Sequence, residues 1–283
     1  MTTVSTLTTT IVLEGEKAQS VSLETVKYAD ILQQDALETS KLLRACQSPG
    51  FFYLDLSGVN AQFNGDAYLE NIQLLHQQQE EYFHLPFHAK MKDYLESSAK
   101  KGYQYFPDCE AFEVPYNSSR ADDIPSPLNP QSVCQVMAHT HAIAVTLIRC
   151  LSPFIGNEDI RKYVRSIHDD RDVSLSGMRL ENILAAETGG CIHSSGNTDK
   201  GSMTLRHCDE VIIEYLDAET GRWVYIEPHQ GCLIVNVADL LQTASHGLFQ
   251  SPLHRVGHPM VGTQARRCLA YHLWPSDNYV MDL

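Results

Sequence analysis

The sequence is poor in basic residues. Its 283 residues include 21 Lys and Arg against 35 Asp and Glu, which gives a formal net charge of −14 at pH 7 with histidine neutral. A chain this acidic does not gain affinity for a phosphate backbone by counterion release, so we do not expect a nucleic acid partner. Apolar runs approaching the ~18 residues of a membrane span are missing, and so is a basic segment followed by an apolar one near residue 1. We therefore expect neither a membrane span nor a secretory signal.

The sequence also lacks any CxxC pair, although it has eight cysteines. Their spacing is irregular, which is typical neither of a zinc site nor of a disulfide framework. In a chain of this size, such cysteines are expected to be reduced thiols that fill core positions. This predicts a cytoplasmic protein.

Composition is that of an ordinary globular protein, with 43% hydrophobic and 20% charged residues. At ~150 residues per domain the length suggests about two domains, but one large β-barrel enzyme fits equally well.

The first 170 residues carry the helical signals. Asp35, with Glu38 three residues later, is typical of a capping box and predicts a helix start. Further helices are predicted over about 66–83 and 131–151. The stretch from Pro107 to Pro130 holds five prolines, so we predict a long surface loop there.

After residue 170 the pattern changes to short β-rich runs separated by Gly, Asp and Pro. These runs lie at 203–205, 211–216, 223–226, 232–237 and 267–274. Helices first and antiparallel strands second predict a helical layer that supports a β-barrel or sandwich.

Ordered motifs in both halves resemble one enzyme family. In the second half they are NTDKGSMTL at 197–205, GCLIVNVAD at 231–239, SPLHRV at 251–256 and RRCLA at 266–270; in the first half they are PGFFYL at 49–54, YFHLP at 82–86 and KGY at 101–103. Together they are similar to the isopenicillin N synthase-like non-haem Fe(II)/2-oxoglutarate-dependent dioxygenases. The resemblance implies an α+β, mainly β fold with a double-stranded β-helix (jelly-roll) core and flanking helices. Residues 1–170 would form the amino-terminal region and residues 171–283 the core that carries the site, in one catalytic unit.

In that family two histidines and a carboxylate hold Fe(II) on one face and leave the other positions open for 2-oxoglutarate and O₂. The resemblance places these ligands at Asn197, Asp199 and His254, so the first histidine is an asparagine. A carboxamide oxygen is a weaker donor for Fe(II) than an imidazole nitrogen. His193 and His207 are interpreted as loop and strand histidines without a metal, because either would require the strand to reorganise. His207-Cys208-Asp209 also spells HxD, but its distance to His254 differs from the family spacing by ten positions.

The cosubstrate motif is altered as well. The family's Arg-x-Ser, which grips the distal carboxylate of 2-oxoglutarate, appears as Arg266-Arg267-Cys268, and a tyrosine often found on an earlier strand falls at Ile183. Two of three familiar contacts are therefore absent.

Strand alternation makes a further prediction about the pocket. Thr204, Arg206 and Cys208 share one face of a strand. If that face is inward, Arg206 points toward Asp199 and His254 and its charge opposes a divalent cation. The alternative is a strand shifted by one residue, with Arg206 in solvent.

By the same alternation, Arg266, Cys268, Ala270 and His272 share a face. His272 is then either a second pocket group or a core histidine.

Three functions follow from these residues. The favoured prediction is a redox-silent enzyme of specialised small-molecule biosynthesis that catalyses a cyclisation, isomerisation or dehydration (a cyclase, isomerase or lyase) without a cofactor. Its catalytic residues would be Arg206, Asp199 and His254, and its substrate-binding residues Asn197, Thr204, Arg266, Cys268 and His272. The alternative is an active Fe(II)/2-oxoglutarate-dependent oxygenase (hydroxylation, desaturation or oxidative cyclisation), with Asn197, Asp199 and His254 as metal ligands. The third is a small-molecule binding protein without catalysis. Fold alone does not decide among them.

Overall fold

The computed structural model describes residues 8–13, 16–58, 61–95, 101–116, 121–156, 174–184, 195–257 and 265–275. Within these ranges the strands form two sheets. The larger sheet contains, in spatial order, β3 (Thr25–Lys27), β4 (Phe51–Asp55), β11 (Cys232–Val237), β8 (Met203–Cys208), β13 (Arg266–Leu273), β7 (Gly177–Ile183), β6 (Cys109–Pro115) and β5 (Gly102–Tyr105). The smaller sheet contains β1 (Thr8–Leu13), β2 (Glu16–Val21), β10 (Arg222–Ile226), β9 (Ile213–Asp217) and β12 (His254–Val256).

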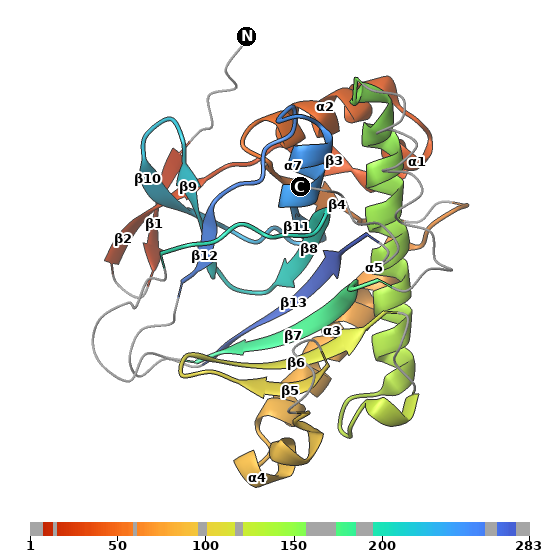
Figure 1. Ribbon diagram of the computed structural model, residues 1–283, viewed down its shortest axis with the longest axis vertical. Helices are drawn as coiled ribbons and strands as arrows, with labels where there is room; N and C mark the ends of the chain where they lie inside the picture. The colour runs from red at the N-terminus through yellow and green to blue at the C-terminus, as the bar shows by residue number, and fades with distance from the viewer. Residues whose placement is uncertain are drawn as a thin grey trace.

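The helices lie against the larger sheet. They are α1 (Tyr28–Leu32), α2 (Ala36–Gln47), α3 (Gly65–Phe83), α4 (Phe87–Lys90), α5 (Pro130–Leu151) and α7 (Asp239–Ala244), with short 3₁₀ turns at Met91–Asp93, Ala121–Asp123 and Ser152–Phe154. Both α3 and α5 contact β13, and α5 also contacts β8. Figure 1 shows α5 along one side of the molecule and the smaller sheet at the other.

Alternation along the strands divides the apolar side chains between two cores. In β4, Phe52 and Leu54 belong to the core beneath the helices, whereas Phe51 and Tyr53 belong to the core that also contains residues of the smaller sheet. Successive side chains of a strand point to opposite faces, so one sheet serves both cores. The predicted helical layer on a β-sandwich is confirmed.

The predicted helix starts are confirmed, with one difference at the first. The backbone N–H of Glu38 donates to Asp35 Oδ1 at 2.9 Å, so Asp35 is the N-cap of α2. The Glu38 carboxylate does not close the predicted box; it is buried and accepts from the backbone N–H of Lys27 at 2.8 Å. The start of α2 is thereby tied to the end of β3.

The predicted loop from Pro107 to Pro130 is wrong in part. Cys109–Pro115 forms β6, which pairs antiparallel with both β5 and β7. Ala111, Phe112 and Val114 are buried, which compensates for the turn signals of the flanking prolines. Because β5 and β6 extend the same sheet as β7, residues on both sides of position 170 build one sheet.

One described helix, 130–154, is long and apolar enough by length and composition to cross a membrane, with a mean hydropathy of 1.2 in its most apolar window. However, 56% of that window is buried inside the fold. Val133, Leu147 and Ile148 are among its side chains that pack in the main core. This is the burial of a core helix, so no membrane protein is indicated.

Candidate active site

The segment that carries Asn197 and Asp199 lies against β12 of the smaller sheet, which carries His254. Asn197 and His254 form a β-bridge in which each backbone N–H donates to the other residue's carbonyl, at 2.9 and 3.0 Å. The segment is fixed at the start of α7, where the Asp239 N–H donates to the Asp199 carbonyl at 2.7 Å. As a result, His254 Nε2 lies 3.7 Å from Asp199 Oδ2.

Asp199 is held by three donors on one oxygen. Its Oδ2 accepts from Thr204 Oγ1 at 2.7 Å, from Asn236 Nδ2 at 3.0 Å and from Arg206 Nη2 at 3.1 Å. Burial alone would raise the pKa of the Asp199 carboxyl, but the neighbouring positive charge of Arg206 outweighs it and holds the pKa well below its usual range. Asp199 is therefore an ionised carboxylate.

Arg206 points into the pocket, as strand alternation predicted; the alternative of a solvated Arg206 is wrong. The residue is only 7% exposed. Its Nη1 donates to Asn236 Oδ1 at 2.5 Å, and its Nη2 lies 3.4 Å from His254 Nε2. Burial opposes the charge of the guanidinium, but Asp199 more than compensates, so the pKa of Arg206 is raised. A permanent cation thus stands between Asp199 and His254.

His254 is a neutral imidazole with its lone pair directed at this cation. Its Nδ1 lies 3.0 Å from the Pro252 carbonyl, which can only accept, so Nδ1 carries the proton and Nε2 the lone pair. Burial and then the Arg206 charge lower the pKa of His254. The Phe51 ring packs edge-on against it, with ring centroids 5.6 Å apart.

His272 is a pocket group rather than a core histidine. Its Nδ1 lies 3.2 Å from Thr204 Oγ1, whose proton is donated to Asp199. His272 and Asp199 both line a cavity of about 400 Å³, together with Arg179 and Trp274. Burial lowers the pKa of His272 to about 4. Its ring therefore extends the polar side of the pocket in a neutral form.

The predicted cosubstrate residues lie further along the same face. In the pairing of β13 with β8, Cys268 stands opposite Cys208, Ala270 opposite Arg206 and His272 opposite Thr204. The Cys208 and Cys268 sulfurs are 2.7 Å apart as free thiols.

Arg266 is opposite Ile183 in the pairing of β13 with β7. Its Nη1 donates to the Val211 carbonyl at 2.7 Å, and its Nε lies 3.1 Å from Glu210 Oε2. The guanidinium is therefore tied to the β8–β9 connection. His193, the other histidine considered in the sequence, lies outside the described residues.

Sequence reasoning missed Asn236. This residue is completely buried on β11 and joins Asp199 to Arg206, because its Oδ1 accepts from Arg206 and its Nδ2 donates to Asp199. The available signal was a single carboxamide in the otherwise apolar run 232–237. Buried polar groups need hydrogen-bond partners, so its presence indicated a polar site beside that strand.

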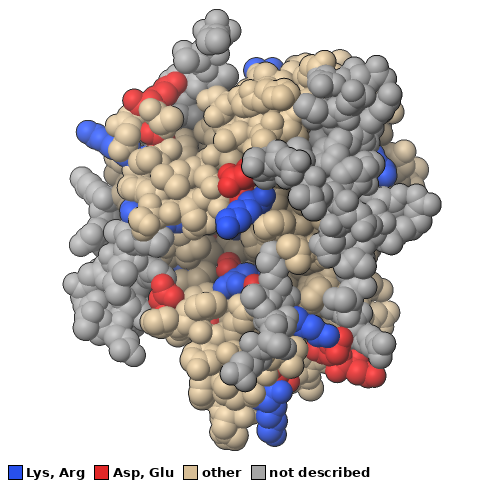
Figure 2. Space-filling model, in the orientation of Figure 1, with Lys and Arg blue, Asp and Glu red and all other residues tan. Residues whose placement is uncertain are grey.

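Charge on the surface is mixed. On the face shown in Figure 2, Lys and Arg side chains lie next to Asp and Glu near the centre, so the net charge of −14 does not form a single acidic patch there.

Two family profiles match the chain. Residues 178–274 match the 2OG-Fe(II) oxygenase superfamily, and residues 22–111 match the non-haem dioxygenase in morphine synthesis N-terminal family. Residues 178–274 therefore form a domain of the 2OG-Fe(II) oxygenase superfamily, as the motifs predicted.

Curated relatives are similar over nearly the whole chain. The 2-oxoglutarate-dependent dioxygenase frbH of Dothideomycetidae sp. (strain 11243) is 27% identical over 294 residues, which cover 95% of this chain and 87% of that protein. The 2-oxoglutarate-dependent dioxygenase gloE of Glarea lozoyensis is 28% identical over 287 residues, which cover 94% and 83%.

Solved structures share the fold. The dioxygenase for auxin oxidation 1 of Arabidopsis thaliana, in complex with 2-oxoglutarate, superimposes with a TM-score of 0.71 at 19% identity, over 92% of this chain and 95% of that one. The dioxygenase for auxin oxidation of rice gives 0.69 at 21% identity, over 91% and 84%. These likenesses confirm the predicted jelly-roll core with flanking helices.

The comparisons contradict the favoured functional prediction. Relatives named as 2-oxoglutarate-dependent dioxygenases, together with the superfamily match, support an oxidoreductase rather than a redox-silent cyclase, isomerase or lyase. The prediction that no cofactor is used is wrong for the same reason; Fe(II) and 2-oxoglutarate are indicated instead. The family pattern along the chain outweighs the single substitutions in the site.

Apart from the Arg206 guanidinium, the side chains of this site are of types that can bind a divalent cation. Asp199 offers a carboxylate, His254 an imidazole lone pair and Asn197 a carboxamide, all ligand types that first-row metals accept. The Asn197 Nδ2 donates to the Thr198 carbonyl at 3.3 Å, and Asn197 is exposed. The Arg206 guanidinium lies in the same space, which means that its present position and a bound cation exclude each other.

Proposed function

We propose that this protein is an Fe(II)- and 2-oxoglutarate-dependent oxygenase that acts on a small molecule by hydroxylation, desaturation or oxidative cyclisation. The observation that carries the proposal is the pair Asp199 and His254. An ionised carboxylate and a neutral imidazole, 3.7 Å apart, stand at the positions of the family's metal motif. The names of the relatives support the same activity.

In this proposal Asn197, Asp199 and His254 hold the metal. Bound Fe(II), with 2-oxoglutarate as the co-reductant that is converted to succinate and CO₂, would activate O₂ for attack on an unactivated C–H bond. The chain's own residues prepare the ligands: Thr204 and Asn236 orient the Asp199 carboxylate, and the Pro252 carbonyl keeps the His254 proton on Nδ1. Arg206 neutralises Asp199 and has to withdraw from it for the metal to bind.

The cavity beside Asp199 is the proposed substrate site. Its volume of about 400 Å³ suits a small organic molecule. His272 would contribute a hydrogen bond from its polar wall, and Thr204 would bind substrate indirectly by orienting Asp199. Arg266 and Cys268 would face the cosubstrate. The match of residues 22–111 to the N-terminal family of the non-haem dioxygenase in morphine synthesis supports a role in specialised-metabolite biosynthesis.

We further propose that residues 1–170 and 171–283 work as one catalytic unit in the cytoplasm. The pairing of β6 with β7 across this boundary supports a single unit. The seven cysteines among the described residues are free thiols, which supports a reducing compartment.

The test combines binding and turnover. Anaerobic calorimetry with Fe(II) should show one site that is lost in Asp199→Asn and kept in Asp122→Asn, an exposed carboxylate in a 3₁₀ turn. With Fe(II), 2-oxoglutarate and O₂, the wild-type protein should release succinate, and a chelator should stop it. The proposal would be overturned if Asp199→Asn binds Fe(II) as well as the wild type does and the wild type forms no succinate.

A further inference from the structure

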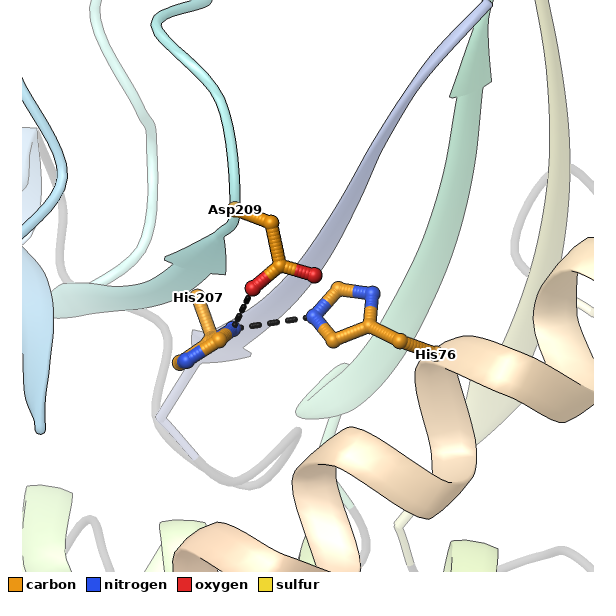
Figure 3. A group of neighbouring side chains, drawn as sticks. All are labelled: His76, His207 and Asp209. Carbon is orange, nitrogen blue, oxygen red and sulfur yellow. Dashed lines mark hydrogen bonds and ion pairs between the residues drawn. The ribbon is translucent and has the colours of Figure 1, made fainter. Parts of the chain in front are cut away.

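A second cluster of potential ligands lies on the opposite side of β8 from Arg206. Alternation directs the side chain of His207 toward α3, where it meets His76. His76 Nε2 is 2.9 Å from His207 Nδ1, and His207 Nδ1 is 3.8 Å from Asp209 Oδ1. Figure 3 shows the three side chains converging from α3, from β8 and from the residues directly after β8.

The spacing of these atoms is that of a tetrahedral metal site. Two ligands that are each ~2.0–2.1 Å from a zinc ion are separated by about 3.3 Å at the tetrahedral angle. The two separations of 2.9 and 3.8 Å bracket this value, and all three potential ligand atoms lie within 4.8 Å of one another. Small side-chain rotations therefore suffice to place an ion between them.

The histidines are in the protonation state that metal binding needs. His76 and His207 are buried, and burial is the main reason that their pKa values are lowered, that of His76 to about 4. Both are neutral at pH 7, so each ring has one lone pair available. In a neutral ring the other nitrogen carries the proton.

A partner is already in place for the His76 proton. Within the part of the chain that the structure describes, His76 Nδ1 is buried without a hydrogen-bond partner, and so is Gln79 Oε1. Gln79 lies one turn further along α3 and favours a proton on the His76 ring. Donation from Nδ1 to this oxygen would leave Nε2 free for a metal, which is the usual outer arrangement of a metal-binding histidine.

The site is also reachable from solvent. The Asp209 side chain is 52% exposed, and a cleft of about 970 Å³ is lined by His207 and Asp209 along with Glu70 and Gln73. A cation can therefore reach the buried imidazoles past the carboxylate. The cleft leaves room for water as a fourth ligand.

We propose that His76, His207 and Asp209 bind a Zn(II) ion that joins α3 to the end of β8. Two imidazoles and one carboxylate are a ligand set of zinc sites, whereas Mg²⁺ and Ca²⁺ prefer oxygen ligands alone. Because the ligands come from positions more than 130 residues apart in sequence, the ion stabilises the folded chain and not the unfolded one. This site is separate from Asn197, Asp199 and His254 and does not depend on the proposed oxygenase activity.

Zinc titration in the Asp199→Asn background tests the site apart from the oxygenase centre. We expect one Zn(II) per chain by calorimetry and a higher melting temperature with zinc than with EDTA. Adding Asp209→Asn, or separately His76→Gln, should weaken zinc binding by at least ~10-fold and abolish the rise in melting temperature. Adding His88→Ala, which removes an exposed histidine of α4, should change neither measurement.

The substitution at Asp209 is decisive if His76→Gln does not fold, because Asp209 is half exposed and its replacement is nearly isosteric. Zinc binding that is equal with and without Asp209→Asn would overturn the proposal, as would the absence of binding in Asp199→Asn alone. Failure of the oxygenase proposal would give a different result. The wild-type protein would then bind no Fe(II) at Asp199, while zinc binding at the second site would persist.

Discussion

Arg206 Nη2 lies 3.1 Å from Asp199 Oδ2 and 3.4 Å from His254 Nε2, so a guanidinium occupies the space between two ligands of the proposed metal site. Asn236 fixes both partners of this ion pair from the side. In the oxygenase that we propose, the ion pair and a bound Fe(II) would therefore be competing states of the same pocket. The affinity for Fe(II) would then include the free energy needed to separate Arg206 from Asp199.

Removing the guanidinium should strengthen metal binding. Arg206→Leu replaces the cation with an apolar side chain, and even at a moderate effective dielectric constant the loss of repulsion at ~4 Å is worth more than a tenfold change in affinity. We expect Fe(II) to bind at least ~10-fold more tightly, as measured by anaerobic calorimetry. Arg44→Met, at an exposed ion pair on α2, is the control and should leave the affinity unchanged. Unchanged or weaker binding in Arg206→Leu would show that Arg206 does not compete with the metal.

Restoring the missing imidazole should also help, and the two changes should be coupled. Asn197→His supplies a better donor, but its benefit depends on whether Arg206 has left the pocket. The gain in Fe(II) binding free energy of the double variant Asn197→His/Arg206→Leu should therefore exceed the sum of the gains of the two single variants. A double-mutant cycle measures this difference, and strict additivity would mean that the two positions act independently.

Gly50 should tolerate a methyl group much less well than Gly247, although both have a positive φ, +88° and +77°. A Cβ at Gly50 would lie 2.1 Å from the Gln250 carbonyl oxygen, whereas nothing lies within 4 Å at Gly247. The Gly50 backbone is fixed by hydrogen bonds to Ala45 and Val237, so it does not shift easily. We expect Gly247→Ala to lower the free energy of unfolding by about 1 kcal/mol and Gly50→Ala by about 3 kcal/mol. Urea denaturation measures both, and equal losses would contradict the contact.

Acid should destabilise the protein partly through His272. Burial lowers its pKa to about 4, below the ~6.5 of an unfolded chain, so between these values the unfolded chain binds more protons. The stabilisation is complete above about pH 6.5 and is lost as the pH falls toward 4, by up to about 3 kcal/mol. Urea denaturation in EDTA at several pH values should give a shallower decline for His272→Gln than for the wild type. Parallel curves would mean that His272 is not buried as described.

Local rules predicted the parts of the site that lie on one strand. Alternation along β8 placed Arg206 inward, and the same rule on β13 grouped Arg266, Cys268 and His272. These predictions needed only the strand period. Helix starts followed from Asp35 and from the spacing of apolar residues in the same way.

Contacts between distant elements were not predictable in this manner. Nothing in the sequence relates His76, on a helix, to His207, 131 residues later. Glu38 was expected to bond within its own helix, but its carboxylate reaches Lys27 on β3. The function was predicted wrongly for a related reason. The sequence shows which side chains stand at positions 183, 197, 206 and 268, but it does not show whether Arg206 can leave Asp199.

The order of strands in the larger sheet has a consequence for synthesis of the chain. Within the described structure β4 pairs only with β3, which precedes it, and with β11, which is made about 180 residues later. Until then, a nascent chain presents the apolar strand Phe51–Asp55 with one edge unpaired, and such edges are prone to association between chains. We expect fragments that end before residue 232 to aggregate once they leave the ribosome. Chains that include Cys232–Val237 can pair this strand with β4 and so close the edge.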